Sequence, residues 1–234
     1  MPRRNREPLV EPCGRPGPGP VSARPYHVLH RAGRAAYHRR MASTTERVVG
    51  KTILYFTKTG KANTDVLLKA ARSRAAALGV RQVVVASTHG FTARRAQAAF
   101  AGTGVEVIAV TIAAAFDKEG WTMKDAERSR LRRAGITVLT CTHALSGELS
   151  EGLGVPSAQD IASRVLYRFC QGMKVAVEVA LMAADAGLLD MRREAIAIGG
   201  TGEGADTAIV VKPAYTRTFL KLQIREIIAK PRVG

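Results

Sequence analysis

The chain has 234 residues, 46% of them apolar, so it can bury a sizeable core in one or two domains. No apolar run reaches the roughly 20 residues of a membrane-spanning helix, so the sequence predicts no membrane span. The formal net charge of +17 is typical of nucleic-acid binders, but the basic side chains fall on helix faces without interleaved aromatic residues. We therefore expect no nucleic-acid partner.

Residues 1–40 differ in composition from the rest of the chain. They contain nine arginines and seven of the ten prolines, and they show no apolar periodicity. Such a segment cannot build a core, so we expect a disordered Arg/Pro-rich extension. A translation start at Met41 would make it an upstream in-frame extension, and the alternative is a functional arm. We expect residues 41–234 to form a single domain.

The three cysteines are Cys13, Cys141 and Cys170. Their spacing matches neither a metal-ligand motif nor a disulfide framework. Reduced thiols in a cytoplasmic protein without a metal site are the expectation.

From residue 51 onward, strand and helix signals alternate along the chain. Strands are predicted over 52–56, 83–86, 105–110, 136–140, 195–198 and 207–211. Helices are predicted over about 64–78, 92–100, 122–134, 157–169 and 173–186. Thr122 with Asp125 and Ser157 with Asp160 have capping-box spacing, and Gly79 has the position of a helix end.

This alternation predicts a three-layer α/β/α sandwich around a mostly parallel sheet. A short glycine-rich turn joins the last two predicted strands, so the last strand should be antiparallel. Parallel sheets bind ligands beyond the carboxyl ends of their strands. Five polar loops are expected at that edge: 57–63, 87–92, 111–121, 140–147 and 199–206.

The second of these loops, residues 87–92, reads STHGFT and leads from a buried strand into a helix. Such a turn presents backbone N–H groups and a helix N-terminus, which suits a phosphate, and Arg94 and Arg95 follow. The alternative is a capped helix start without a ligand. The candidate ligand-binding residues of this loop are Ser87, Thr88, His89, Gly90 and Thr92.

The last loop, residues 199–207, reads GGTGEGADT and has two interpretations. Its glycines serve a ligand site and a tight hairpin equally well. Asp206 either caps the turn or accepts a ligand hydroxyl. The candidate residues of this loop are Gly200, Thr201, Gly202, Gly204, Asp206 and Thr207.

Thr111, Thr142 and His143 follow other predicted strands at the same edge and complete the candidate binding set. His143 has the chemistry of a general acid or base, but no carboxylate partner is identifiable from the sequence. Glu178 falls in a mainly apolar helix, where a carboxylate is costly unless paired. We expect a structural pair between Glu178 and Lys174.

Residues 83–94 (VVVASTHGFTAR) and 107–111 (VIAVT) resemble the C-terminal α/β domain of pyruvate kinase. Residues 199–211 resemble the last hairpin of that domain, and 176–189 resemble the helix before it. The resemblance implies a phosphate site in the loop after the second strand, where pyruvate kinase holds a sugar-bisphosphate effector. His89 and Phe91 depart from the small or basic residues of that effector loop.

The chain also resembles a stand-alone family of proteins similar to this domain, over residues 50–232. The shared motifs are 58–64 (KTGKANT), 140–147 (TCTHALSG), 183–187 (AADAG), 199–202 (GGTG) and 224–231 (IREIIAKP). This resemblance implies bound FMN, and Trp121 would then either cover the flavin ring or serve packing. The chain has no room for the catalytic barrel of pyruvate kinase, so we expect no pyruvate kinase activity.

Three functions remain open at this point. The favoured one is a binding module for a small phosphorylated ligand such as FMN. The second is an enzyme that acts on such a ligand through His143, His89 or Glu119. The third is a regulatory or oligomerisation module, in which case the chain forms a homo-oligomer.

Overall fold

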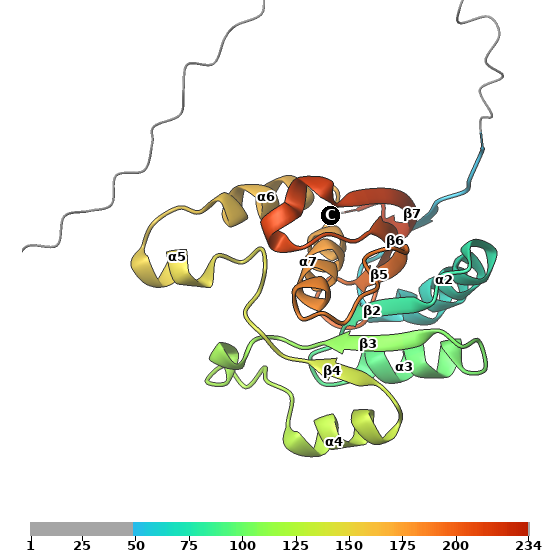
Figure 1. The fold of residues 1–234 in the computed structure, drawn as a ribbon, viewed down its shortest axis with the longest axis horizontal. Helices are drawn as coiled ribbons and strands as arrows, with labels where there is room; N and C mark the ends of the chain where they lie inside the picture. Colours follow the sequence, from blue (N-terminus) through green and yellow to red (C-terminus); the bar gives the residue numbers. More distant parts are fainter. Residues whose placement is uncertain (1–48, 234) are drawn as a thin grey trace, which may run out of the picture. The chain divides into compact units, whose positions relative to one another are not determined.

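The computed structural model describes residues 49–233, and the folded unit that begins at Lys51 is built around a seven-stranded sheet (Figure 1). The strands are β1 (Leu54–Phe56), β2 (Gln82–Ala86), β3 (Glu106–Val110), β4 (Thr137–Leu139), β5 (Ala195–Gly199), β6 (Thr207–Lys212) and β7 (Gln223–Pro231). The α-helices are α2 (Thr64–Leu78), α3 (Phe91–Phe100), α4 (Asp125–Arg133), α5 (Glu148–Leu153), α6 (Ala158–Leu166) and α7 (Gln171–Asp185). Short 3-10 segments are Lys61–Asn63, Ala114–Phe116 and Thr216–Lys221. The predicted extension and the start at Met41 lie outside the described residues.

The strand order is β1-β7-β6-β5-β2-β3-β4, and β6 is the antiparallel strand among them. The predicted antiparallel pairing of β5 with β6 is confirmed. One further strand, β7, follows β6 and returns parallel to β5, so the antiparallel strand lies within the sheet. Val83, Val84 and Val85 of β2 are fully buried, as expected for a parallel strand that is covered on both faces.

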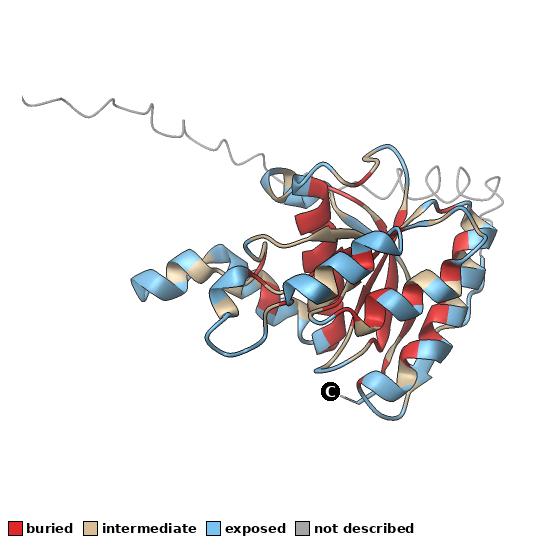
Figure 2. Cartoon of the chain, turned by 90° about the horizontal axis from the view of Figure 1, so that it is seen from below, coloured by how far each residue is buried: buried red, intermediate tan, exposed pale blue. Residues whose placement is uncertain are grey.

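Helices cover both faces of the sheet, which confirms the three-layer architecture. One core cluster joins the sheet to α2, α3 and α4, and the other joins it to α6 and α7. In Figure 2 the buried residues follow the sheet and the inward faces of these helices. Helix α7 packs closely on β5. A Cβ atom added to Gly199 would lie only 2.4 Å from the carbonyl oxygen of Gly172, so the contact requires glycine at this position.

The predicted helix boundaries are largely confirmed. Gly79 ends α2 in the left-handed conformation, with φ of 66°. At α6, the Ser157 hydroxyl accepts from the Asp160 N–H at 3.2 Å, and the Asp160 carboxylate accepts from the Ser157 N–H at 3.0 Å. These two bonds are the predicted capping box.

The predicted start of α4 is wrong. The helix begins after Lys124, whose N–H donates to the Glu127 carboxylate at 2.9 Å. Thr122 instead donates its hydroxyl hydrogen to Asp117. Glu127 accepts from the N–H of the residue before the helix, Lys124, as Asp125 was expected to accept from the Thr122 N–H.

Within residues 49–233, none of the helices combines the length and the apolar character needed to cross a membrane.

Replacing Glu226 with glutamine is expected to lower stability at pH 7 by about 1 kcal/mol. Two bonds to Arg74, at 2.5 and 2.6 Å, tie β7 to α2 and lower the pKa of Glu226 below its ordinary value. Because the folded pKa is lowered, this contribution is present above the unfolded value of about 4.3 and is lost as the pH falls through the folded value. Urea unfolding should therefore show different stabilities for the two proteins at pH 7 and nearly equal stabilities at pH 3.

The control is Glu203→Gln, which removes an exposed carboxylate that pairs with Lys61. It should change stability by less than about 0.5 kcal/mol at either pH. A Glu226→Gln protein as stable as the original chain at pH 7 would rule out a stabilising role for the pair with Arg74.

Candidate functional site

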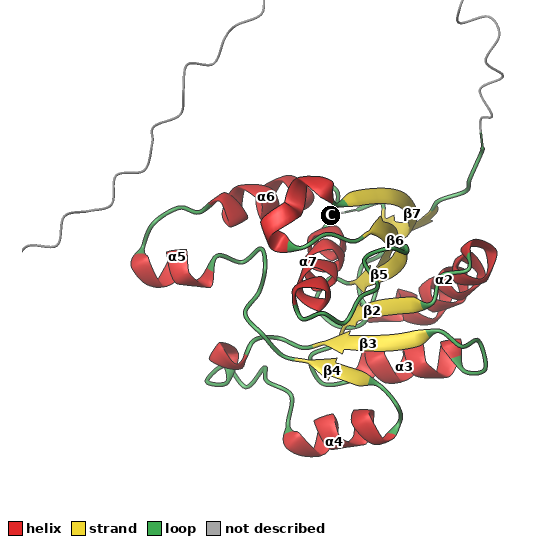
Figure 3. Cartoon of the chain, viewed as in Figure 1, coloured by secondary structure: helices red, strands yellow, loops and turns green. Residues whose placement is uncertain are grey.

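The predicted polar loops lie together at the carboxyl edge of the sheet. In Figure 3 the loops that leave β2, β3 and β4 are green and emerge from the same ends of the arrows. β5 runs parallel to β2, and for that reason the loop over residues 200–206 also lies at this edge.

Ser87 closes the start of α3. Its hydroxyl accepts a hydrogen bond from the Ala93 N–H at 3.1 Å, and its own N–H donates to the Val110 carbonyl at 2.9 Å. The side chain is buried. Ser87 therefore shapes the loop from within the fold, as the capped-helix alternative predicted for this residue.

The rest of the loop leaves its backbone donors free. Among the hydrogen bonds of residues 49–233, none uses the N–H groups of Thr88, His89, Gly90 or Thr92. The hydroxyls of Thr88 and Thr92 also lack a partner within that range. The first turn of a helix has no internal acceptors for its N–H groups, and the helix dipole adds partial positive charge there. Four residues of this segment thus offer free N–H donors at one helix start.

A guanidinium lies close to Gly90 in this loop. Gly90 has φ of +82°, and a Cβ atom added to it would lie 3.2 Å from Nη1 of Arg94. Arg94 forms no ion pair within the described part of the chain, whereas the neighbouring Arg95 pairs with Asp65. The free donors therefore lie next to a positive charge that no carboxylate neutralises.

His89 is tied to α4. Its Nδ1 atom lies 3.1 Å from Oε2 of Glu127. Burial acts to raise the pKa of Glu127, but hydrogen bonds from the Lys124 N–H and the His89 ring hold that pKa below its ordinary value. Glu127 is therefore a carboxylate near neutral pH, and it fixes the His89 ring at one side of the loop.

Asp206 and Thr207 are interior residues. The Asp206 carboxylate accepts from the N–H groups of Gly60 at 2.8 Å and Thr201 at 3.1 Å. It also accepts from the Thr207 hydroxyl at 2.9 Å, and both side chains have 0% exposure. Asp206 thus caps the glycine-rich turn and joins it to the loop after β1. In this arrangement neither residue reaches a ligand at the surface.

The tip of the glycine-rich turn is open to solvent. A Cβ atom on Gly200 would lie 2.4 Å from the Gly204 carbonyl oxygen, which shows how tightly the hairpin closes. Thr201 is partly exposed, and Gly202 is exposed. The tip from Thr201 to Glu203 is therefore accessible to a ligand, and Glu203 is paired with Lys61.

Lys61 brings three loops together. Its Nζ atom lies 2.8 Å from the Glu203 carboxylate and 4.7 Å from the centre of the Phe91 ring. The hydrogen bond from Lys61 lowers the pKa of Glu203 below its ordinary value. The loops after β1, β2 and β5 therefore meet around a lysine that sequence reasoning did not select.

Thr111 takes part in a polar cluster at the ends of β3 and β4. Its hydroxyl lies 2.5 Å from that of Thr140, which also accepts from Nη2 of Arg128 at 3.0 Å. Thr142 is exposed and stands apart from this cluster. Arg128 is a second basic residue that the sequence analysis missed. Its place in the helix that begins at this edge was the available signal.

His143 has a carboxylate neighbour that could not be identified from the sequence. Nδ1 of His143 lies 2.6 Å from Oε1 of Glu148, at an angle that does not make a hydrogen bond. Nε2 accepts from the Ala113 N–H at 3.2 Å, and the Phe116 ring lies 5.5 Å away. Both ring nitrogens face groups of the fold, so His143 joins the loop after β3 to α5.

Cys141, beside His143, is not a thiolate. Burial raises its pKa, and the negative charges of Asp185 and Glu148 raise it further. A thiol must ionise to act as a nucleophile. The cluster of Cys141 and His143 therefore gives little support to catalysis. Within residues 49–233, no three metal-ligating side chains gather into a site.

The predicted pair of Glu178 with Lys174 is confirmed. Nζ of Lys174 lies 2.6 Å from the Glu178 carboxylate, and both side chains are buried within α7. Glu178 also accepts from the Leu145 N–H at 2.9 Å and the Ser146 hydroxyl at 3.1 Å. The pair therefore fixes the loop after β4 on α7.

The chain matches no protein-family model. Among solved structures it is similar to a pyruvate kinase from Cryptosporidium parvum, with 14% identity, a TM-score of 0.37, and coverage of 77% of this chain and 26% of that one. The Cryptosporidium parvum pyruvate kinase in complex with ADP has 14% identity and a TM-score of 0.34, with coverage of 76% of this chain and 26% of that one. A third structure of that organism's pyruvate kinase has 12% identity and a TM-score of 0.34, with coverage of 77% of this chain and 26% of that one. The chain spans about a quarter of the length of these proteins.

Proposed function

We propose that this protein binds a small phosphorylated ligand at the start of α3 and has no pyruvate kinase activity. The observation that supports this most directly is the set of free backbone donors over residues 88–92, near the unpaired guanidinium of Arg94. An uncharged ligand would gain no attraction from that positive charge. A phosphate carries negative charge and several acceptor oxygens, so it satisfies both features at once.

Gly90 is central to this proposal. Without a side chain it lets an oxygen approach the backbone N–H groups closely, and its φ of +82° suits glycine. The dipole of α3 adds attraction for an anion over the first turn. A hydrogen bond to a charged group contributes about 1.5–3 kcal/mol, so two or three of them contribute roughly 3–9 kcal/mol before the entropic cost of association is subtracted.

FMN is the ligand that we propose to test first. Its phosphate suits the loop over 88–92. Its ribityl chain has hydroxyls that Thr201 and Gly202 can contact, since the loops after β2 and β5 end neighbouring strands and meet around Lys61. When bound, FMN supplies the redox chemistry of its isoalloxazine ring. The protein residues named here hold the phosphate and orient the chain.

Titration calorimetry with FMN, inorganic phosphate and fructose bisphosphate tests this site. Thr92→Ala and Thr201→Ala should each weaken FMN binding by about 1 kcal/mol, the contribution of one neutral hydrogen bond. Their effects should be non-additive, because both groups contact one ligand. The affinity for inorganic phosphate should fall in Thr92→Ala and stay unchanged in Thr201→Ala.

The matched control is Thr137→Ala, which removes a hydroxyl from β4 near the opposite edge of the sheet. It should leave all three affinities unchanged. A change at only one of Thr92 and Thr201 would reject the shared site. Unchanged affinity in both variants, for every compound that binds, would reject phosphate binding at this loop.

A further inference from the structure

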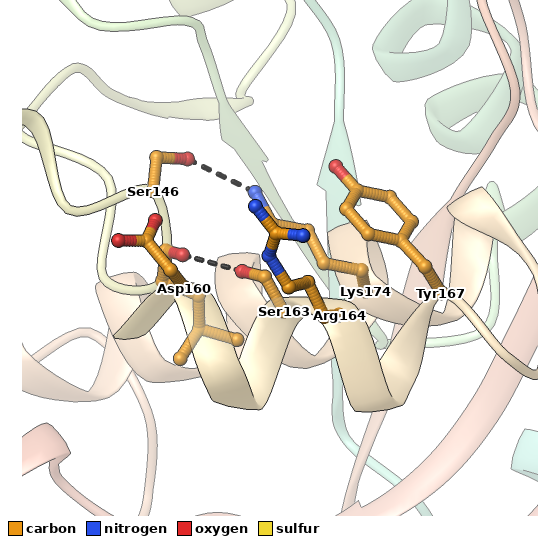
Figure 4. A pocket seen from close by; sticks show the side chains of 7 residues that line it. Ser146, Asp160, Ser163, Arg164, Tyr167 and Lys174 are labelled. Carbon is orange, nitrogen blue, oxygen red and sulfur yellow. Dashed lines mark hydrogen bonds between the residues drawn. The ribbon is translucent and has the colours of Figure 1, made fainter. Parts of the chain in front are cut away.

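A pocket of about 400 Å³ lies where α6, the first turn of α7 and the loop after β4 meet (Figure 4). Its volume is within the range of small-molecule sites. The lining residues are Leu145, Ser146, Asp160, Ser163, Arg164, Tyr167 and Lys174. Most of these side chains belong to helices, which hold them in fixed relative positions.

Lys174 forms the inner wall of the pocket. Its side chain is 8% exposed, and its Nζ atom donates to the Glu178 carboxylate at 2.6 Å and to the Ser146 hydroxyl at 3.0 Å. A lysine ammonium has three N–H donors. One donor therefore remains for a group inside the pocket, while Glu178 holds the ammonium in place.

Arg164 and Tyr167 form the outer wall. In Figure 4 the Arg164 guanidinium lies in front of the Lys174 ammonium, and the Tyr167 hydroxyl lies beside them. Among the hydrogen bonds and ion pairs of residues 49–233, none involves either the guanidinium or this hydroxyl. Three polar groups from two helices therefore present free donors to one space.

Asp160 carries the negative charge of the pocket, and its Oδ2 atom is already engaged, whereas its Oδ1 atom has no hydrogen-bond partner within residues 49–233. The carboxylate accepts from the Ser157 hydroxyl at 2.8 Å and from the Ser157 N–H at 3.0 Å. These bonds lower the pKa of Asp160, first through the hydroxyl and then through the N–H. The Ser163 hydroxyl likewise donates to the Leu145 carbonyl. Free donors thus outnumber free acceptors in the pocket.

We propose that this pocket binds a small organic anion, a carboxylate or a phosphate ester. The Arg164 guanidinium, the Tyr167 hydroxyl and the third N–H of Lys174 would donate to its oxygens. Within residues 49–233 no protein group accepts from the Arg164 guanidinium or the Tyr167 hydroxyl, and an anion would supply acceptors for both. The pocket lies at α6 and α7, on the opposite face of the sheet from α3, so this site is independent of the loop over 88–92.

Calorimetric titration of the full chain with benzoate and with phenyl phosphate tests the proposal and distinguishes the two anion types. Arg164→Gln should lower the affinity for the probe that binds roughly tenfold, because it removes a charge-assisted hydrogen bond. Tyr167→Phe keeps the aromatic ring and should lower the same affinity about threefold to tenfold. The matched control is Arg168→Gln, one turn further along, which removes an exposed guanidinium that does not line the pocket.

The expected result is weakening in Arg164→Gln and Tyr167→Phe, with the Arg168→Gln protein within about twofold of the original chain. Equal weakening in Arg168→Gln would show general charge attraction and overturn the proposal. So would the absence of millimolar binding for both probes. Gly90→Val must leave benzoate binding intact, and loss of binding there would place the anion at α3 instead. A melting temperature for each variant confirms folding, since the replaced groups are exposed.

Discussion

Replacing Glu178 with alanine is expected to lower the free energy of unfolding by about 3–5 kcal/mol. The change leaves the buried ammonium of Lys174 without its counter-charge, which was 2.6 Å away. It also removes the acceptor of the Leu145 N–H and of the Ser146 hydroxyl. Removing one partner of a buried ion pair costs more than the pair itself contributes, because the remaining charge stays away from water.

Urea unfolding measured by circular dichroism checks this value. The control is the double variant Lys174→Met with Glu178→Leu, which removes both charges and keeps apolar volume. It should be more stable than Glu178→Ala, with a loss of about 1–3 kcal/mol that reflects the orphaned Leu145 N–H. A loss below about 1 kcal/mol in the single variant, or a larger loss in the double variant, would show that the pair is not the main support of the loop after β4.

Gly90→Val is expected to weaken phosphate and FMN binding at least roughly a hundredfold, which corresponds to about 3 kcal/mol. The new side chain would begin 3.2 Å from Nη1 of Arg94 and 3.2 Å from the Leu131 methyl groups. It would displace the guanidinium or push the loop away from Leu131, and either change disturbs the donors that an anion needs. Valine at φ of +82° also strains the backbone by about 1–3 kcal/mol.

Gly102→Val separates the effect on binding from the strain. Gly102 follows α3 with φ of +73°, and a Cβ atom there meets no atom within 4 Å. This variant should lose similar stability and keep its affinity for FMN. Equal loss of affinity in the two variants would mean that binding depends on general stability, and normal affinity in Gly90→Val would remove the loop from the site.

The parts of the fold with strong local signals could be predicted from the sequence. β2 is a continuous apolar run that is buried on both faces, and the turn after it contains glycine and hydroxyl residues. Gly79 and the box of Ser157 with Asp160 mark helix ends through bonds within a few residues. In these places the local chemistry and the tertiary structure agree.

β7 and α5 were missed because the rest of the fold stabilises them. The first half of β7 is exposed and contains Arg225 and Glu226, so its pattern is not that of a buried strand. Its position depends on pairing with β6 and on Arg74, which is 152 residues from Glu226 in the chain. α5 is six residues long and exposes Leu149 and Leu153, so it lacks an inward apolar stripe.

The candidate site divides in the same way. The phosphate-type loop and the helix behind it were predicted, because one short segment contains both. The roles of Lys61, Arg128 and Glu148 depend on loops that meet only in the folded chain. Asp206 could be assigned to the turn only once the loop after β1 was in place, since Gly60 supplies one of its donors.

The most direct measurement of phosphate binding is a ¹H–¹⁵N NMR titration of the full chain with inorganic phosphate. The phosphate site predicts saturable shifts of the Thr88, His89, Gly90 and Thr92 amides, because these N–H groups change from free donors to donors to an anion. The same shifts should persist in Gly102→Val and vanish in Gly90→Val. Unchanged amide chemical shifts for residues 88–92 throughout the titration would contradict phosphate binding at the start of α3.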